Sequence, residues 1–292
     1  MLLRSSGISW PFVESLVGGW RDRSIFHSLR RCAVFLGHPR GGGSLVGALL
    51  NAHPQTCLAA DAGLFQYLRQ GYRRSQLLWL VYRKDRAAGR RLRLDGDYRF
   101  AVPGQWQGCF ESLRVIGDVK TGNATEWLAR HPECLEELEG ELGVPLRIIQ
   151  LVRDPFQVVL SQHRAYPHIP IQRFVEDYFR RCEVMDRVAR ERPEAVLVAR
   201  LEELLSSPTR VLASLCAHLG LDADAAYLDA CQLVVHELTS ARTSVTGEGQ
   251  GPGRDLRRPF PRAMVERIDA NVERFAFLRA YRRERADLRE AA

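Results

Sequence analysis

The chain lacks the features that mark membrane-spanning and secreted proteins. No uninterrupted apolar run approaches the ~20 residues that a membrane helix requires. Residues 1–30 are interrupted by Pro11, Glu14, Arg21 and Asp22, and no clean apolar segment precedes a small-residue cleavage site. We therefore expect neither a membrane span nor a secretory signal, and the expected location is the cytoplasm.

The cysteines supply neither a disulfide framework nor a zinc site. They are seven in number, which is odd, and they are scattered without a CxxC pair. None lies near a histidine at the spacing of zinc ligands. We expect buried, reduced thiols and no metal site.

Lysine is almost absent, although the chain is basic. Lys84 and Lys120 are the only lysines among 42 basic residues, so the other forty are arginine. Against 35 acidic residues this leaves a net charge of +7. A positive, arginine-rich protein attracts anions, and the guanidinium fork suits phosphate and sulfate. An enzyme with a phosphorylated substrate and a nucleic-acid-binding protein both fit this composition.

Short β-branched runs alternate with longer helical patterns along the chain. Four near-continuous apolar runs predict buried strands at residues 32–37, 113–117, 146–152 and 195–199. Helices are expected at residues 44–51, 64–86, 123–142, 155–163, 171–192, 208–219, 221–231 and 261–275. This alternation predicts an α/β fold with a parallel sheet covered by helices on both faces.

One large domain is expected to hold all of these elements. It spans residues 31–292 and follows an N-terminal extension at residues 1–30. A glycine- and arginine-rich stretch without hydrophobic periodicity, at about residues 240–258, is expected to be a mobile loop.

A candidate anion site follows the first predicted strand. Three consecutive glycines allow backbone amides to approach a ligand, and the next helix adds the positive end of its dipole. The ATP-binding signature GxxxxGK[ST] is missing, because no lysine precedes the serine. A simple strand-to-helix turn is the alternative. The candidate anion ligands are Arg40, Gly41, Gly42, Gly43, Ser44 and Leu45.

A second candidate anion site follows the third predicted strand. Arg153 leaves the strand end, and Asp154 and Pro155 are suited to begin a helix. Ser161 lies two turns along that helix, where it could meet a small anion together with Arg153. A capped helix with an exposed arginine is the alternative.

These two segments together resemble the sulfotransferase family that uses 3′-phosphoadenosine 5′-phosphosulfate (PAPS). The segment 39–46, PRGGGSLV, is similar to the family's PRSGTTLL-like 5′-phosphosulfate loop. The segment 153–161 keeps the RDP and the serine of the family's 3′-phosphate site. The segment 200–204, RLEEL, is similar to the family's YEDL segment, with Leu201 in place of the tyrosine. The resemblance covers roughly residues 32 to 220.

The resemblance implies a P-loop-like three-layer fold with a central parallel sheet, and PAPS as co-substrate. It implies transfer of a sulfuryl group to a hydroxyl of an acceptor, with no metal and no nucleic acid as partner. Carbohydrate, tyrosyl peptide and small phenol all remain as acceptors, and the acceptor could be anionic. A nucleotide-dependent kinase and a basic nucleic-acid-binding protein remain as alternatives.

The resemblance also places a catalytic base and a catalytic lysine. Counting eight residues from His53, as in the tyrosylprotein type of the family, gives Asp61 as the base. A helix N-cap is the alternative role for Asp61, and His163 and Glu202 are the next candidates for the base.

Lys120 follows the second predicted strand and resembles the family lysine that faces the sulfate. Arg40 is expected to assist it in the chemistry. Asp118 is expected to orient Lys120 or to cap a turn.

Overall fold

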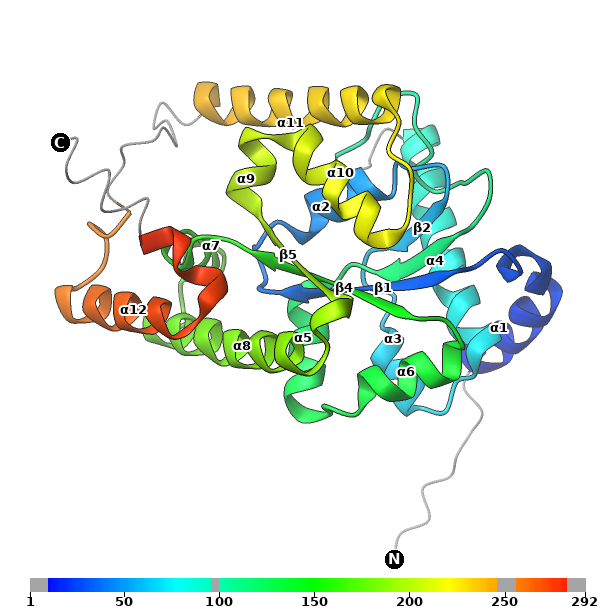
Figure 1. Cartoon of the computed structure of the whole chain (residues 1–292), viewed down its shortest axis with the longest axis horizontal. Coiled ribbons are helices and arrows are strands. Elements are labelled where there is room, and N and C mark those ends of the chain that lie inside the picture. Colours follow the sequence, from blue (N-terminus) through cyan, green and yellow to red (C-terminus); the bar gives the residue numbers. More distant parts are fainter. Residues whose placement is uncertain (1–9, 96–99, 246–255, 283–292) are drawn as a thin grey trace, which may run out of the picture.

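A five-stranded, wholly parallel sheet forms the centre of the molecule (Figure 1). The computed structural model describes residues 10–95, 100–245 and 256–282. The strand order is β2-β3-β1-β4-β5. The strands are β1 (Arg31–Gly37), β2 (Thr56–Ala59), β3 (Val115–Asp118), β4 (Leu146–Val152) and β5 (Val196–Arg200).

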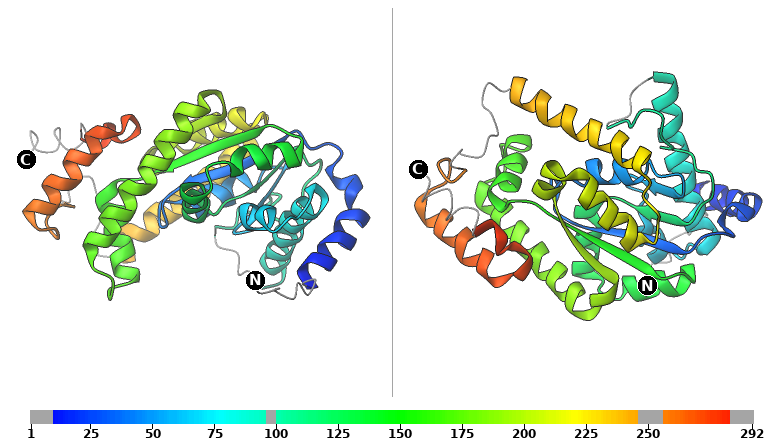
Figure 2. Two further views of the ribbon diagram at one scale, coloured as in Figure 1. Left: turned by 90° about the horizontal axis from the view of Figure 1, so that it is seen from below. Right: turned by 45° about the horizontal axis from the view of Figure 1, so that its top comes forward.

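Helices cover both faces of this sheet (Figures 1 and 2). They are α1 (Trp10–Arg21), α2 (Gly43–Leu50), α3 (Leu64–Arg69), α4 (Arg74–Asp95), α5 (Thr121–Arg130), α6 (Cys134–Leu142), α7 (Pro155–Ala165), α8 (Ile171–Glu191), α9 (Leu201–Ser206), α10 (Pro208–Leu219), α11 (Ala225–Val245) and α12 (Arg262–Arg274). Three short 3-10 turns lie at Arg23–Phe26, Pro193–Ala195 and Ala276–Leu278. No helix in the described ranges is long and apolar enough to cross a bilayer.

The central strand divides its side chains between two hydrophobic layers. Cys32, Val34 and Leu36 of β1 join a core that includes residues of α3 to α8 and α12. Ala33 and Phe35 face the opposite way, into a core with α2, α9, α10 and α11. A strand buried on both faces needs apolar residues at every position, which explains its near-continuous apolar sequence. The predicted three-layer α/β fold is confirmed.

Two predicted helices are each divided in two, and one strand was not predicted, for local reasons. The helix expected at 64–86 is divided into α3 and α4, because Gly71 adopts a left-handed φ of +84°. The helix expected at 123–142 is divided into α5 and α6 around Pro132, which cannot continue a helix. Strand β2 was not predicted, since its four residues are too few to show a pattern.

The expected loop at about 240–258 overlaps a helix. Helix α11 continues to Val245, so residues 240–245 are helical and the predicted start of the loop is wrong. Residues 246–255 lie outside the described part of the chain. Before the sheet, Phe26 and Leu29 are buried in the core, so part of the expected N-terminal extension packs with the domain.

Candidate functional site

The predicted site residues all follow carboxyl ends of strands. Arg40 comes after β1, Asp61 after β2, Lys120 after β3 and Arg153 after β4. All strands are parallel, so these segments emerge at one edge of the sheet. Strand β1 lies between β3 and β4, which places its loop at the point where open α/β sheets bind ligands.

The loop after β1 requires glycine because of its backbone conformation and because other side chains pack closely against it. Gly42 has a left-handed φ of +100°, and a Cβ there would lie 2.7 Å from Cδ1 of Leu201. A Cβ at Gly43 would lie 2.9 Å from Cγ2 of Thr121. Helix α2 begins at Gly43, and the first turn of a helix leaves backbone N–H groups without intrahelical partners. The loop therefore presents donors and a positive dipole end to an anion.

The two candidate anion segments contact each other. Nε of Arg40 donates to Oγ of Ser161 at 3.1 Å, and Nη1 of Arg153 donates to the carbonyl of Arg40 at 2.9 Å. Asp154 accepts from the backbone N–H groups of residues 156 and 157, as expected for the cap of α7. Two guanidinium groups and a hydroxyl thus lie beside the glycine loop. This arrangement can bind a ligand with two separate anionic groups.

Asp61 and Lys120 form an ion pair that the sequence did not reveal. Nζ of Lys120 lies 2.5 Å from Oδ2 of Asp61, and the two side chains are 46% and 47% exposed. Nζ of Lys84 also donates to Asp61, but to its backbone carbonyl. Asp61 has a left-handed φ of +65°, a conformation that aspartate and asparagine adopt more readily than most residues. A carboxylate and an ammonium group are therefore held together at the mouth of the site.

The helix cap that was considered for Asp61 is made by Asp118 instead. Oδ2 of Asp118 accepts from the backbone N–H of Gly63 at 2.6 Å and of Leu64 at 3.3 Å, at the start of α3. Its Oδ1 accepts from the backbone N–H of Lys120 at 3.3 Å. Asp118 therefore caps the turn before α3, which is one of the two roles expected for it, and its contact with Lys120 is to the backbone N–H and not to the ammonium group. The N-cap role considered for Asp61 is wrong.

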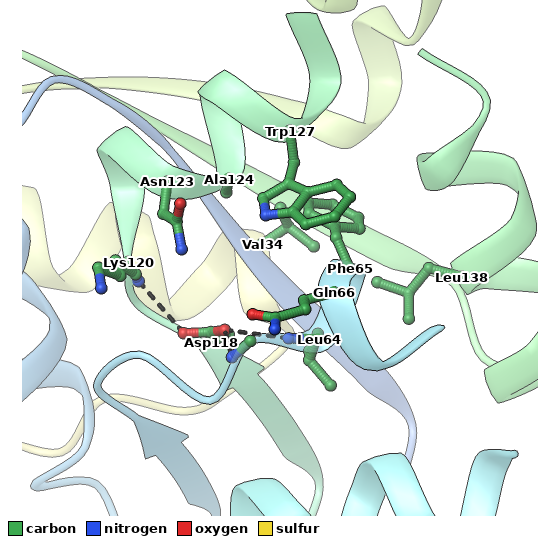
Figure 3. Close-up of a pocket in the computed structure, with 11 residues that line it drawn as sticks. Val34, Leu64, Phe65, Gln66, Asp118, Lys120, Asn123, Ala124, Trp127 and Leu138 are labelled. Carbon is green, nitrogen blue, oxygen red and sulfur yellow. Dashed lines mark hydrogen bonds between the residues drawn. The ribbon is translucent and has the colours of Figure 1, made fainter. Parts of the chain in front are cut away.

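A pocket opens beside Lys120, between α3 and α5 (Figure 3). Figure 3 shows Lys120 and Asp118 on its polar side, with Trp127 and Leu138 on the opposite side. Phe65 and Ala124 also line it. A ligand group that reaches Lys120 from this pocket contacts mainly apolar side chains.

A buried ring pair supports both anion segments and was missed in the sequence. His38 stacks on Tyr178 at 3.8 Å between ring centroids, and its Nε2 lies 3.0 Å from the carbonyl of Tyr178. The Tyr178 hydroxyl donates to the carbonyl of Arg153 at 2.8 Å. Tyr178 thus connects the start of the glycine loop with the second segment. The two rings are 140 residues apart, so no local pattern relates them.

The two reserve candidates for a base have other partners. Glu202 accepts from the backbone N–H of Asp154 at 3.0 Å and from the hydroxyl of Tyr281 at 2.7 Å. Burial raises the pKa of the Glu202 carboxyl. Nδ1 of His163 lies 3.2 Å from the carbonyl of Ile169. Glu202 therefore joins α9 to α7 and to the C-terminal segment.

The buried imidazole predicts a pH dependence of stability. Burial lowers the pKa of His38 from 6.5 to about 3. Between these values the unfolded chain binds a proton that the folded chain does not, so stability is lost as the pH falls below 6.5. From pH 7 to pH 5 this group removes about 2 kcal/mol from the free energy of unfolding. Urea denaturation at several pH values measures the slope.

The control for this effect is His38→Phe, which retains a stacking ring without a titratable group. The variant should lose less stability than the unmodified chain over the same pH interval, by about 2 kcal/mol. Equal losses in the two proteins would contradict the assignment.

The described residues contain no group of three or more His, Cys, Asp or Glu side chains that could hold a metal ion. The positive groups of the site are guanidinium and ammonium groups of Arg40, Lys120 and Arg153. Any anion that binds at this edge therefore meets protein cations.

Several solved structures are similar to the chain at low identity. The sulfotransferase domain of a Synechococcus PCC 7002 olefin synthase is 19% identical, with a TM-score of 0.43 over 70% of this chain and 78% of that chain. Mouse sulfotransferase SULT7A1, complexed with PAP, is 14% identical, with a TM-score of 0.48 over 90% and 89% of the two chains. Sulfotransferase STF9 from Mycobacterium avium is 12% identical, with a TM-score of 0.47 over 90% and 81%.

The family is shown by the match of a family profile. No curated protein matches the sequence. A profile of the Sulfotransferase family matches residues 33–225, which is more than half of the chain. This range includes the glycine loop, Asp61, Lys120 and the segment from Arg153 to Ser161. The chain belongs to the sulfotransferase family.

Proposed function

We propose that this sulfotransferase transfers the sulfuryl group of PAPS to a hydroxyl of its acceptor. The contact between the two anion segments carries the proposal. The donor bears a 5′-phosphosulfate and a 3′-phosphate, and Arg40 after β1 and Arg153 and Ser161 after β4 lie together at one edge of the sheet. A single anion site would not discriminate among phosphate-containing compounds, whereas two adjoining sites favour a ligand that carries two separate anionic groups.

The backbone of the loop and Arg40 would hold the 5′-phosphosulfate. The loop donors in this proposal are the N–H groups of Gly42, Gly43 and Ser44, because those of Gly41 and Leu45 already donate to the carbonyls of His38 and Gly42 at 3.0 Å. Arg153 and Ser161 would hold the 3′-phosphate, and the hydrogen bond from Arg40 to Ser161 supports the proposal that the two sites adjoin. Gly41 and Gly43 stand where the family usually has serine and threonine, so backbone N–H groups supply most of the loop's donors here.

In the proposed reaction Asp61 accepts the proton of the acceptor hydroxyl. The acceptor oxygen then forms a bond to sulfur, and the bond from sulfur to the bridging phosphate oxygen breaks. Lys120 and Arg40 stabilise the negative charge that grows on the bridging and sulfuryl oxygens. The products are a sulfate ester and 3′-phosphoadenosine 5′-phosphate. Protein cations supply the positive charge, so the proposal requires no metal ion.

The pocket beside Lys120 favours one kind of acceptor. Phe65, Ala124 and Trp127 form its apolar wall. An acceptor with an apolar group next to its hydroxyl would lay that group against this wall, with the hydroxyl near Lys120. The pocket encloses only about 20 Å³, so it would receive the edge of such a group and not a whole ring. Among the three acceptor classes, a tyrosyl or phenolic group fits this wall better than a carbohydrate.

Donor recognition is tested by comparing nucleotides with and without the 3′-phosphate. The protein should bind 3′-phosphoadenosine 5′-phosphate about 30- to 150-fold more tightly than AMP, because a charge-assisted arginine contact contributes about 2–3 kcal/mol. Isothermal titration calorimetry measures both affinities. ATP should also bind weakly.

Ser161→Ala provides the matched variant for this experiment. It should lower the affinity for 3′-phosphoadenosine 5′-phosphate while leaving the affinity for AMP nearly unchanged. Equal binding of the nucleotides by the unmodified protein would contradict the proposed donor.

A further inference from the structure

Helix α7 contacts the glycine loop through two consecutive side chains. Oγ of Ser161 accepts from Nε of Arg40 at 3.1 Å, and Nε2 of Gln162 donates to the carbonyl of Pro39 at 2.9 Å. Consecutive residues of a helix point about 100° apart, because one turn holds 3.6 residues. The two contacts therefore hold adjacent loop residues from two directions. Gln162 is only 5% exposed, so its contact is shielded from water.

The contacts between the loop and the second anion segment differ in whether the donor would use the same groups. Arg40 contacts Ser161, and Nη1 of Arg153 donates to the carbonyl of Arg40 at 2.9 Å. In the proposed function these three side chains bind the two anionic groups of PAPS, so a bound donor competes for their hydrogen bonds. The hydrogen bond from Gln162 to Pro39 uses none of the proposed donor ligands. It can therefore persist when both anion sites are occupied.

The internal shape of the loop depends on other contacts. The N–H of Gly41 donates to the carbonyl of His38 at 3.0 Å, which closes the turn before the glycine run. The N–H of Val46 donates to the carbonyl of Gly42 at 3.1 Å, as α2 begins. Gln162 takes part in neither of these bonds. Its amide therefore determines where the loop lies relative to α7, and not the shape of the loop itself.

We propose that Gln162 is a positioning residue that aligns the two anion sites for one donor molecule. The proposal rests on the proposed function, because it concerns how PAPS is held. When the two sites are held in a fixed relation, a ligand with both anionic groups binds without first ordering the loop against α7. Its second group then meets its site at a high effective concentration. A ligand with one anionic group uses one site, so it gains nothing from the alignment.

Three nucleotides separate the alignment of the sites from the strength of each site. AMP carries the 5′-phosphate, adenosine 3′-monophosphate carries the 3′-phosphate, and 3′-phosphoadenosine 5′-phosphate carries both. Gln162→Met removes the amide donor and nearly keeps the length of the side chain. It should lower the affinity for 3′-phosphoadenosine 5′-phosphate by about tenfold, the effect of one ordinary hydrogen bond, and leave both monophosphates nearly unchanged. Isothermal titration calorimetry with the full chain measures the three affinities.

Two further variants sharpen this comparison. Ser161→Ala should weaken the binding of adenosine 3′-monophosphate as well, because Ser161 is a proposed ligand of the 3′-phosphate. Gln162→Asn keeps an amide that is one methylene too short to reach Pro39, so it should reproduce the selective loss of Gln162→Met. It supplies the same comparison if methionine does not fit the buried position.

Gln150→Met is the matched control for the loss of a buried amide. Nε2 of Gln150 donates to the carbonyl of Met185 at 2.7 Å, and the side chain is 0% exposed between β4 and α8. This contact does not join the glycine loop to α7. Gln150→Met should therefore keep the preference for 3′-phosphoadenosine 5′-phosphate over both monophosphates, even where it lowers stability. Circular dichroism and urea denaturation show whether each variant is folded.

Three results would overturn the alignment alone. Full affinity for 3′-phosphoadenosine 5′-phosphate in folded Gln162→Met or Gln162→Asn would show that the sites stay aligned without the amide. An equal loss for all three nucleotides would make Gln162 a support of the loop itself, and the same selective loss in Gln150→Met would make the effect general. If the unmodified protein binds 3′-phosphoadenosine 5′-phosphate no more tightly than AMP, the proposed function fails, and the alignment fails with it.

Discussion

Lys120→Ala is expected to lower turnover by about 10²–10³-fold, with donor affinity little changed. In the proposed reaction the ammonium group meets charge that develops on the bridging and sulfuryl oxygens, so its stabilising effect is larger in the transition state than in the bound donor. Steady-state kinetics with PAPS and a phenolic acceptor measures turnover. Calorimetry with 3′-phosphoadenosine 5′-phosphate measures the affinity.

Lys84→Ala is the matched control for Lys120→Ala. Both lysines donate to Asp61, but Lys84 reaches the backbone carbonyl and Lys120 reaches the carboxylate. Lys84→Ala should therefore keep most of the turnover. Loss of the Lys120 ion pair should cost about 0–1 kcal/mol of stability, because both partners are about half exposed. Equal turnover in the two variants would contradict the role of Lys120.

The strands could be predicted from the sequence where helices cover both faces of the sheet. The run from Cys32 to Gly37 is apolar at nearly every position because helices cover both faces of β1. That Arg40, Lys120 and Arg153 come to one edge of the sheet could also be predicted, since each follows a strand and parallel strands bring their carboxyl ends together. Both inferences depend on residues that are adjacent in sequence.

Contacts between distant segments could not be predicted in this way. His38 and Tyr178 belong to different elements, and their stacking depends on how α8 lies across the sheet. The pair of Asp61 and Lys120 depends on β2, a strand too short to recognise. Helix α1 buries its glycines and exposes its tryptophans, against the usual rule that the apolar face of a helix is buried, because Gly18 packs directly on α4.

Asp61→Asn is expected to lower turnover by about 10²–10⁴-fold, the usual contribution of a general base, while donor binding stays intact. Asparagine retains the size of the side chain and tolerates the left-handed φ of +65°, so the variant removes the proton acceptor without straining the backbone. Alanine at this position would remove the proton acceptor and also strain the backbone, so a loss of turnover could not be assigned to either cause. Asp61→Glu keeps a carboxylate, of the length usual in the tyrosylprotein type of the family. This variant should therefore retain part of the activity that Asp61→Asn loses. Single-turnover kinetics measures the chemical step.

Near-normal turnover of Asp61→Asn would mean that another group accepts the proton. Glu202 is a poor replacement, because one of its oxygens accepts from the backbone N–H of Asp154 and the other from Tyr281. His163 would then be the next residue to replace. If His163→Gln also kept its turnover, neither Asp61 nor His163 would be the base, and only the donor-binding part of the proposal would stand. A large loss in Asp61→Asn, with recovery in Asp61→Glu, assigns the proton transfer to the carboxylate that faces Lys120.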